Sequence, residues 1–270
     1  MESNLMDFID KQIRDLGEPY DKDVFHYTKM SNLFRIITEE GIVFHAGRYD
    51  SMNDPNDSMY LTYLENQKRF QDGTFELFGD FGVEDINAYL VSFSCNQDNS
   101  LMWRLYDADI CLHVNPSIIH EHCIKSNCVH THMGNISYVD KPQDVPNVRE
   151  LMCRSEKEPK NKEQLEFEAC VALSFGKHKD FSAENEWRIA CFDDDGDIWS
   201  KVMEKGVRYG SLWLYRELRL PKECLTAITI RTYDKEFFAN LCDQISIVLN
   251  EYAYPITKND IYRTKTAQVR

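Results

Sequence analysis

The chain has 270 residues, of which 43% are hydrophobic and 28% charged, a balance typical of a soluble globular protein with an apolar core. Lys and Arg total 31 against 45 Asp and Glu, and the formal charge of −14 repels phosphate backbones, so we expect no non-specific nucleic-acid binding. No stretch approaches the ~18 apolar residues of a membrane span. Nine cysteines without paired spacing favour reduced thiols over a disulfide framework. We therefore expect a cytoplasmic protein that does not contact a membrane.

The predicted elements begin with an amphipathic helix in residues 1–20. Its apolar residues recur at helical spacing, and its acidic residues interrupt any continuous apolar run, so it does not resemble a secretory signal. A core over residues 24–270 follows, without an internal repeat or a Gly/Ser/Pro linker. We expect one domain over residues 1–270.

The core alternates irregularly between apolar runs and segments with helical spacing. Strands are predicted at 24–28, 42–46, 89–95, 135–139, 184–191 and 225–230. Helices are predicted at 30–40 with Gly41 as the C-terminal cap, at 58–69, 99–106 and 115–127, after residue 164 through Phe175, and at 234–252. Turns are predicted at 51–57 and 192–197, and an exposed charged loop at 153–164. This order indicates an α+β fold with mixed, mostly antiparallel sheets and flanking helices.

Three of the predicted strands combine an apolar face with a polar one. Strand side chains alternate between faces, so residues two apart point the same way. The polar residues so aligned are His26, Thr28, Ser92, Ser94, Glu184, Glu186 and Arg188. We predict that they line one cleft. The opposite faces predict that Phe25, Trp187 and Ile189 are buried.

The same alternation has a purely structural interpretation. A sheet with one solvated face produces it by default. A Glu-x-Glu pair at a strand edge discourages edge-to-edge aggregation, and Glu186 would then form an exposed ion pair with Arg188.

Five short motifs occur in a fixed order along the chain. They are H-Y-T at residues 26–28, N-D-P at 53–55, S-F-S at 92–94, M-W at 102–103 and E-x-E-W-R at 184–188. As an ordered set they resemble a bacterial family of unknown function, from about Val24 to about Ile230. Two features of that family are missing. A His-x-Gly usually follows the M-W segment, and Arg231 stands where a glycine is usual.

More distantly, the order of H-x-T, serine and E-x-E strands resembles that of ADP-ribosyltransferases. The resemblance implies a split sheet, NAD as a substrate and no metal. It implies that Glu184 and Glu186 are catalytic, and that the dinucleotide is bound by His26, Tyr27, Thr28, Ser92, Ser94 and Arg188. Such a protein would transfer ADP-ribose to an unidentified macromolecular acceptor or hydrolyse NAD, as a toxin or phage-defence enzyme of a bacterial conflict or stress system.

Two other functions remain open from the sequence. The same fold could serve as a non-catalytic sensor or interaction module, with the E-x-E motif in a structural ion pair. A zinc-dependent hydrolase is the second alternative, because one segment is rich in zinc-type ligands. These are His113, His120, His122, Cys123, Cys128, His130 and His132.

Overall fold

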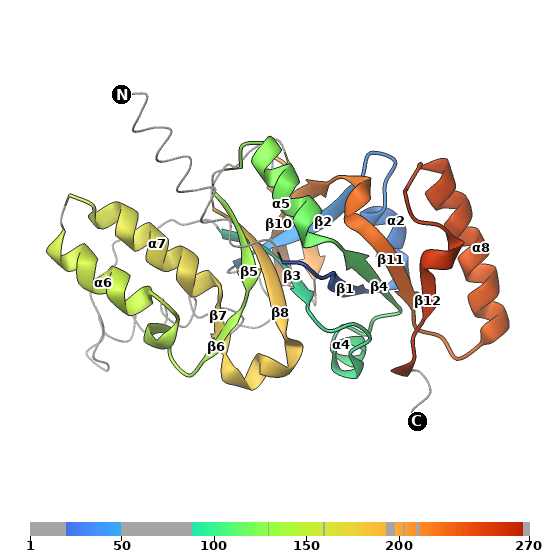
Figure 1. Cartoon of the computed structure of the whole chain (residues 1–270), viewed down its shortest axis with the longest axis horizontal. Helices are drawn as coiled ribbons and strands as arrows, with labels where there is room; N and C mark the ends of the chain where they lie inside the picture. The colour runs from blue at the N-terminus through green and yellow to red at the C-terminus, as the bar shows by residue number, and fades with distance from the viewer. Residues whose placement is uncertain are drawn as a thin grey trace.

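The computed structural model describes residues 20–49, 88–128, 130–158, 160–192, 198–201, 203–208 and 211–266. The predicted N-terminal helix, the N-D-P turn, the helix ending near Arg69 and the turn at 193–197 lie outside these residues. Figure 1 shows the described part as a central sheet with helices on both sides.

The strands are β1 (Val24–Thr28), β2 (Ile42–Arg48), β3 (Ala88–Ser94), β4 (Ile110–Val114), β5 (Thr131–Asn135), β6 (Ser137–Val139), β7 (Gly176–His178), β8 (Glu186–Phe192), β9 (Glu204–Arg208), β10 (Ser211–Leu220), β11 (Leu225–Ile230) and β12 (Ile261–Arg263). The α-helices are α2 (Leu33–Ile36), α4 (Ser100–Leu105), α5 (Pro116–Lys125), α6 (Val148–Lys157), α7 (Lys162–Ser174) and α8 (Lys235–Glu251). The 3-10 helices are η1 (Met30–Asn32), η3 (Pro142–Asp144), η4 (Lys179–Glu184), η5 (Lys222–Cys224) and η6 (Lys258–Asp260).

Within the described residues, ten strands form one sheet and β6 pairs with β7 in a second. The pairs of the large sheet are antiparallel except β11–β12, and the β6–β7 pair is parallel. The predicted fold, a mixed and mostly antiparallel sheet with flanking helices, is confirmed.

Strand β3 is the point at which the large sheet divides. One edge of β3 pairs with β8 over its whole length, from Ala88 to Ser94. The other edge is shared: β1 pairs at Ser94 through Phe25, and β2 pairs at Tyr89 and Leu90. The strands that carry the H-Y-T, S-F-S and E-x-E motifs are therefore neighbours in space, in the order β1, β3, β8.

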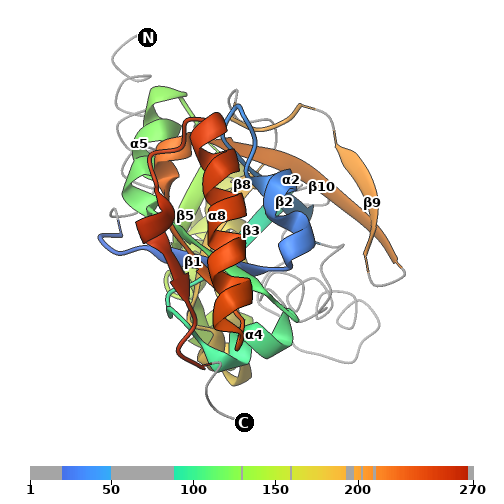
Figure 2. The same ribbon diagram turned by 90° about the vertical axis from the view of Figure 1, so that its right-hand side faces the viewer.

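The two faces of the β3–β8 pair bury different apolar clusters. Phe93, Trp187 and Ile189 belong to the larger cluster, which reaches α2, α5 and α8. Leu90 and Phe192 face the other way and pack with residues of α6 and α7. Figure 1 shows α6 and α7 at one end of the molecule and α8 at the other, and Figure 2 shows α8 lying across the sheet. The predicted burial of Phe25, Trp187 and Ile189 is confirmed.

Side-chain caps fix the starts of three predicted helices. Asn99 accepts a hydrogen bond from the backbone N–H of Leu101, Asn115 caps α5 ahead of Pro116, and Asp234 caps α8. Gly41 is not the helix cap that the sequence predicted, because α2 ends at Ile36. Gly41 instead has φ of 147° where the chain enters β2, and a Cβ there would lie 2.4 Å from the carbonyl oxygen of Leu220.

The predicted exposed loop at 153–164 is wrong. Most of it belongs to α6 and α7, which are joined near residues 158–161. Val148 and Met152 of α6 are buried at helical spacing, so the charged residues mark the solvent face of an amphipathic helix. Strands β4, β7, β9, β10 and β12 were not predicted from the sequence. All five residues of β4 are buried, so its two faces show no polar alternation.

Candidate functional site

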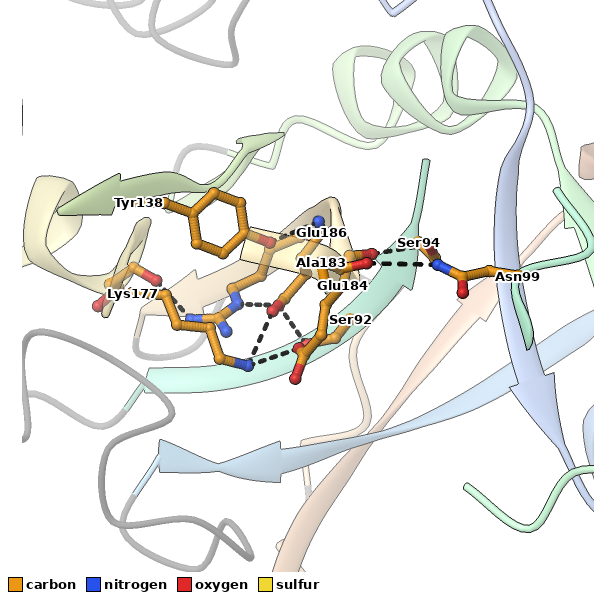
Figure 3. A network of polar contacts seen from close by, with 10 residues as sticks. Ser92, Ser94, Asn99, Tyr138, Lys177, Ala183, Glu184 and Glu186 are labelled. Atoms are coloured by element: carbon orange, nitrogen blue, oxygen red, sulfur yellow. Dashed lines mark hydrogen bonds and ion pairs between the residues drawn. The ribbon is translucent and has the colours of Figure 1, made fainter. Parts of the chain in front are cut away.

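The centre of the site is the carboxylate of Glu186, on the first residue of β8. In the antiparallel pair, Glu186 lies opposite Ser94 and Arg188 lies opposite Ser92. The side chain of Glu186 leans diagonally, and its Oε1 accepts hydrogen bonds from Ser92 Oγ at 2.6 Å and from Arg188 Nε at 2.7 Å. Its Oε2 lies 3.3 Å from Nζ of Lys177. Figure 3 shows the contacts of Glu186 with Ser92 and Lys177.

The backbone of Glu186 is fixed as well. Its N–H donates to the hydroxyl of Tyr138 at 2.8 Å, and its carbonyl oxygen accepts from the N–H of Ile136 at 3.0 Å. Burial raises the pKa of the Tyr138 phenol to about 12, so this hydroxyl is neutral. Each polar atom of Glu186 therefore has a partner, and its carboxylate has one defined orientation.

The sequence predicted Glu184 on the same strand as Glu186. In the structure Glu184 lies instead at the end of η4. Asn185 between the two glutamates has φ of 45° and ψ of 61°, the left-handed conformation that Asn tolerates better than most residues. The turn still brings the two carboxylates together, because Nζ of Lys177 donates to Oε2 of Glu184 at 2.8 Å.

The charged groups of the site are buried. The side chains of Lys177 and Glu186 are each 4% exposed, that of Glu184 is 10% exposed, and that of Arg188 is fully buried. Arg188 also donates from Nη1 to the carbonyl oxygen of Ser174 at 2.7 Å, which ties β8 to the end of α7. The exposed ion pair expected from a solvated strand edge is therefore wrong. Two buried cations face two buried carboxylates.

The loop after β3 and the turn before β8 hold each other in place. Ser94 Oγ donates to the carbonyl oxygen of Glu184 at 2.8 Å, and the Asn99 amide donates to that of Ala183 at 3.3 Å (Figure 3). The side chain of Asn185 donates to Asn96 Oδ1 at 2.9 Å. Ser94 therefore positions the turn that carries Glu184, whereas Ser92 contacts the carboxylate of Glu186 itself.

The prediction that His26 and Thr28 line one cleft with the serines and glutamates is wrong. Phe25 is opposite Ser94, so His26 shares its face with Phe93 and Trp187, not with Ser92 and Glu186. The imidazole lies against Phe44 and Phe93, with ring centroids 4.8 and 5.7 Å away. The oxygen of Thr28 accepts a hydrogen bond from Asn32 at 3.0 Å. Alternation within a strand gives the two faces of that strand, but only the register between strands decides which faces coincide.

His26 nevertheless touches the backbone of the site. Its Nδ1 lies 3.4 Å from the carbonyl oxygen of Ser92, and because a carbonyl only accepts, Nδ1 carries the proton in this contact. Ser92 lies in the part of β3 between its pairing with β1 and its pairing with β2.

Tyr27 is the H-Y-T residue that shares a face with Ser94. Its hydroxyl donates to the carbonyl oxygen of Asn96 and accepts from the N–H of Asn99, both at 2.8 Å. Burial raises the pKa of the phenol. Tyr27 is thus engaged in fixing the loop that follows the S-F-S motif.

Lys177 and Tyr138 are the site residues that the sequence did not indicate. Lys177 stands in the charged run 177–180, where nothing distinguishes a buried lysine from the exposed Lys179 beside it. Both residues belong to the small parallel pair β6–β7, in which Tyr138 is opposite Lys177. The predicted strand at 135–139 contains β6, but β7 has only three residues and was not predicted from the sequence.

The histidines and cysteines of residues 113–132 do not form a zinc site. His113 is buried in β4 with its Nε2 2.8 Å from the hydroxyl of Thr229, and Cys123 packs in the larger apolar cluster. His130 and His132 lie against Phe167 and Phe192. Among the described residues, no three His, Cys, Asp or Glu side chains are grouped as a metal site requires.

In the part of the chain that the structure describes, no helix has the length and apolar character needed to cross a membrane.

Comparison with known proteins gives one match. Residues 102–189 match the family model described as "Protein of unknown function (DUF2971)". No curated protein and no solved structure matches the chain. The matched segment is less than half of the chain; it contains the M-W and E-x-E-W-R motifs and leaves the H-Y-T, N-D-P and S-F-S motifs outside. Over residues 102–189, which include Lys177, Glu184, Glu186 and Arg188, the chain is similar to an uncharacterised family.

Proposed function

We propose that this protein consumes NAD, as an ADP-ribosyltransferase or an NAD glycohydrolase of a bacterial conflict or stress system, with Glu186 at the reacting ribose. The observation that carries the proposal is the fixed orientation of the Glu186 carboxylate, with Ser92 and Arg188 on Oε1 and Lys177 on Oε2. A carboxylate held in advance at a fixed position is what electrostatic catalysis requires.

The reaction breaks the bond between C1′ of the ribose and the nicotinamide nitrogen. The electron pair leaves with nicotinamide, which becomes neutral, and C1′ passes through an oxocarbenium-like state as in glycoside hydrolysis. Water or an acceptor group then forms a new bond to C1′ and gives up a proton. Glu186 stabilises the positive charge as it develops, and Glu184 accepts the proton.

Oε2 is the oxygen of Glu186 that faces the ribose in this proposal. Oε1 already accepts two short hydrogen bonds, which use both of its lone pairs. Oε2 has the longer 3.3 Å contact with Lys177 and retains one lone pair for a ribose hydroxyl.

The observed register of β1, β3 and β8 changes the roles proposed for the binding residues. Ser92 and Arg188 act through the Glu186 carboxylate, and Ser94 and Tyr27 act through the loop after β3. His26 and Thr28 lie on the other face of the sheet, where His26 contacts the Ser92 carbonyl, so this proposal does not assign them to the dinucleotide. The acceptor remains a macromolecule or water.

The non-catalytic module is the second candidate, and one specific observation favours it. Lys177 and Arg188 balance the charges of Glu184 and Glu186, and a buried, balanced cluster of this kind holds β7, η4 and β8 together without any ligand. In that case the E-x-E motif stabilises the folded chain through these ion pairs and has no catalytic role.

Nicotinamide release from NAD separates the two candidates. The purified full chain, Glu186→Gln and the control Glu223→Gln, at an exposed position on η5, are incubated with NAD below the melting temperature of each. The proposal expects release by the parent and the control, and a rate lower by about 10²–10³ for Glu186→Gln. Silence of the parent with water, protein and nucleic acid offered as acceptors would establish the non-catalytic candidate.

A further inference from the structure

Lys177 lies between the two carboxylates of the E-x-E motif. Its Nζ is 2.8 Å from Oε2 of Glu184 and 3.3 Å from Oε2 of Glu186, and Figure 3 shows the ammonium group directed at both. The same Nζ lies 4.9 Å from the centroid of the Phe181 ring. A single buried cation therefore bridges the two residues to which the proposed function assigns chemistry.

Two buried carboxylates that share a site do not both stay ionised without a cation. Their mutual repulsion and the low polarity around them cause one of the two to retain its proton. Arg188 is committed to Oε1 of Glu186 and to the carbonyl of Ser174. Among the contacts of the described residues, Lys177 is the cation that joins both Oε2 atoms.

We propose that Lys177 is a positioning residue that keeps Glu184 and Glu186 ionised together and side by side. Its chemical consequence rests on the proposed function, in which Glu186 must be negative to stabilise the oxocarbenium-like state and Glu184 must be free of a proton to accept one. Lys177 makes no bond to the reacting atoms itself.

Other titratable groups also face the pair. Tyr138 from β6 accepts the hydrogen bond of the Glu186 N–H, and Cys95, the residue after β3, is near enough for the Glu186 charge to raise the pKa of its thiol. Burial raises the pKa of the Cys95 thiol, as it does that of the Tyr138 phenol, so both are neutral near pH 7. Arg188 on β8 supplies the second positive charge. Neither neutral group replaces the charge of Lys177.

Three variants isolate the charge of Lys177. Lys177→Met keeps a long side chain without the charge, Lys177→Arg restores a cation, and Lys179→Met removes a lysine charge two residues away. Lys179 is a matched control because it is 58% exposed and pairs with Asp140, not with the E-x-E motif. Lys177→Gln serves as the uncharged variant should Lys177→Met fail to fold.

The first readout does not depend on NAD. Infrared spectra at pH 7 are expected to show the C=O band of a protonated carboxyl group in Lys177→Met, but not in the parent, Lys177→Arg or Lys179→Met. Adding Glu184→Gln to Lys177→Met removes one of the competing carboxylates, and the band is expected to disappear. A folded, uncharged variant without the band would overturn the inference.

The second readout is NAD turnover. In Lys177→Met kcat at pH 7 is expected to fall by about 10²-fold with little change in KM, and to recover as the pH rises and the retained proton leaves. Lys177→Arg is expected to restore most of kcat at pH 7. A fall in kcat that is the same at every pH, or equal in Lys179→Met, would contradict the inference. If the parent releases no nicotinamide, the proposed function fails, while the infrared spectra still decide whether Lys177 keeps both carboxylates ionised.

Discussion

The hydroxyl of Ser92 donates a 2.6 Å hydrogen bond to Oε1 of Glu186, diagonally across the β3–β8 pair. Hydrogen bonds to a charged acceptor are stronger and more directional than those between neutral groups. This contact links the S-F-S motif to the E-x-E motif, which lie more than ninety residues apart in the chain.

Removing that hydroxyl should weaken catalysis without abolishing it. In Ser92→Ala, Arg188 still holds Oε1, so nicotinamide release is expected to fall by about 10- to 100-fold, the equivalent of one hydrogen bond to a charged group. Ser246→Ala is the control, because Ser246 bonds only the carbonyl of Cys242 within α8 among its described contacts. Equal rates for Ser92→Ala and the control would show that the contact has no role in turnover.

Glu186→Gln should also destabilise the fold. The substitution leaves Lys177 and Arg188 buried with only Glu184 to balance them, and removing one partner of a buried ion pair costs about 3–5 kcal/mol. Denaturant unfolding of the parent and the variant measures this difference. A loss below about 1 kcal/mol, typical of an exposed pair, would mean that solvent reaches the cluster in solution.

Trp187 tests the assignment of strand faces. Its side chain is 2% exposed, and its ring centroid lies 5.7 Å from that of Phe93. Trp187→Ala is expected to lower the free energy of unfolding by about 3–5 kcal/mol. Tyr233→Ala, at a residue that is 60% exposed, should change it by less than about 0.5 kcal/mol. Comparable losses in the two variants would be incompatible with the observed packing.

His113 should make stability depend on pH. Burial lowers the pKa of its imidazole to about 4, whereas an unfolded chain has a histidine pKa of about 6.5. Between these values the unfolded state binds the proton and the folded state does not, so stability falls as the pH drops from 6.5 to 4. The loss from this residue amounts to about 3 kcal/mol. In His113→Gln, which does not titrate, this part of the pH dependence should vanish; an unchanged slope would show that other groups cause it.

Sequence patterns predicted the strands that show local alternation and the starts of three helices, but not the end of the helix before Gly41. The strands around Phe25, Phe93 and Trp187, and the capped starts of α4, α5 and α8, follow from periodicity and from single Asn or Asp residues. The pattern could not fix how strands meet. The single pair Phe25–Ser94 sets the face of the H-Y-T strand, and no periodicity within either strand encodes it.

The candidate site shows the same limit. Ser92, Glu186 and Arg188 were found by alternation on two strands that pair with each other, whereas Glu184 belongs to η4 and reaches the site through the turn at Asn185. Lys177 could not be predicted as a site residue, because it lies on β7 and is placed by the parallel pairing of β7 with β6, opposite Tyr138. A lysine in a charged run gives no sign of burial, and only the folded chain places it beside Glu184.

The central claim is that NAD reacts at the Glu186 carboxylate, and a crystal structure of Glu186→Gln soaked with NAD tests it most directly. The variant keeps the shape of the side chain while slowing turnover, so the dinucleotide should survive in the crystal. We predict electron density for the nicotinamide ribose with a hydroxyl within hydrogen-bond distance of the side chain at position 186. Density elsewhere on the chain, or none at saturating NAD with the cluster around Lys177 and Arg188 unchanged, would contradict the claim.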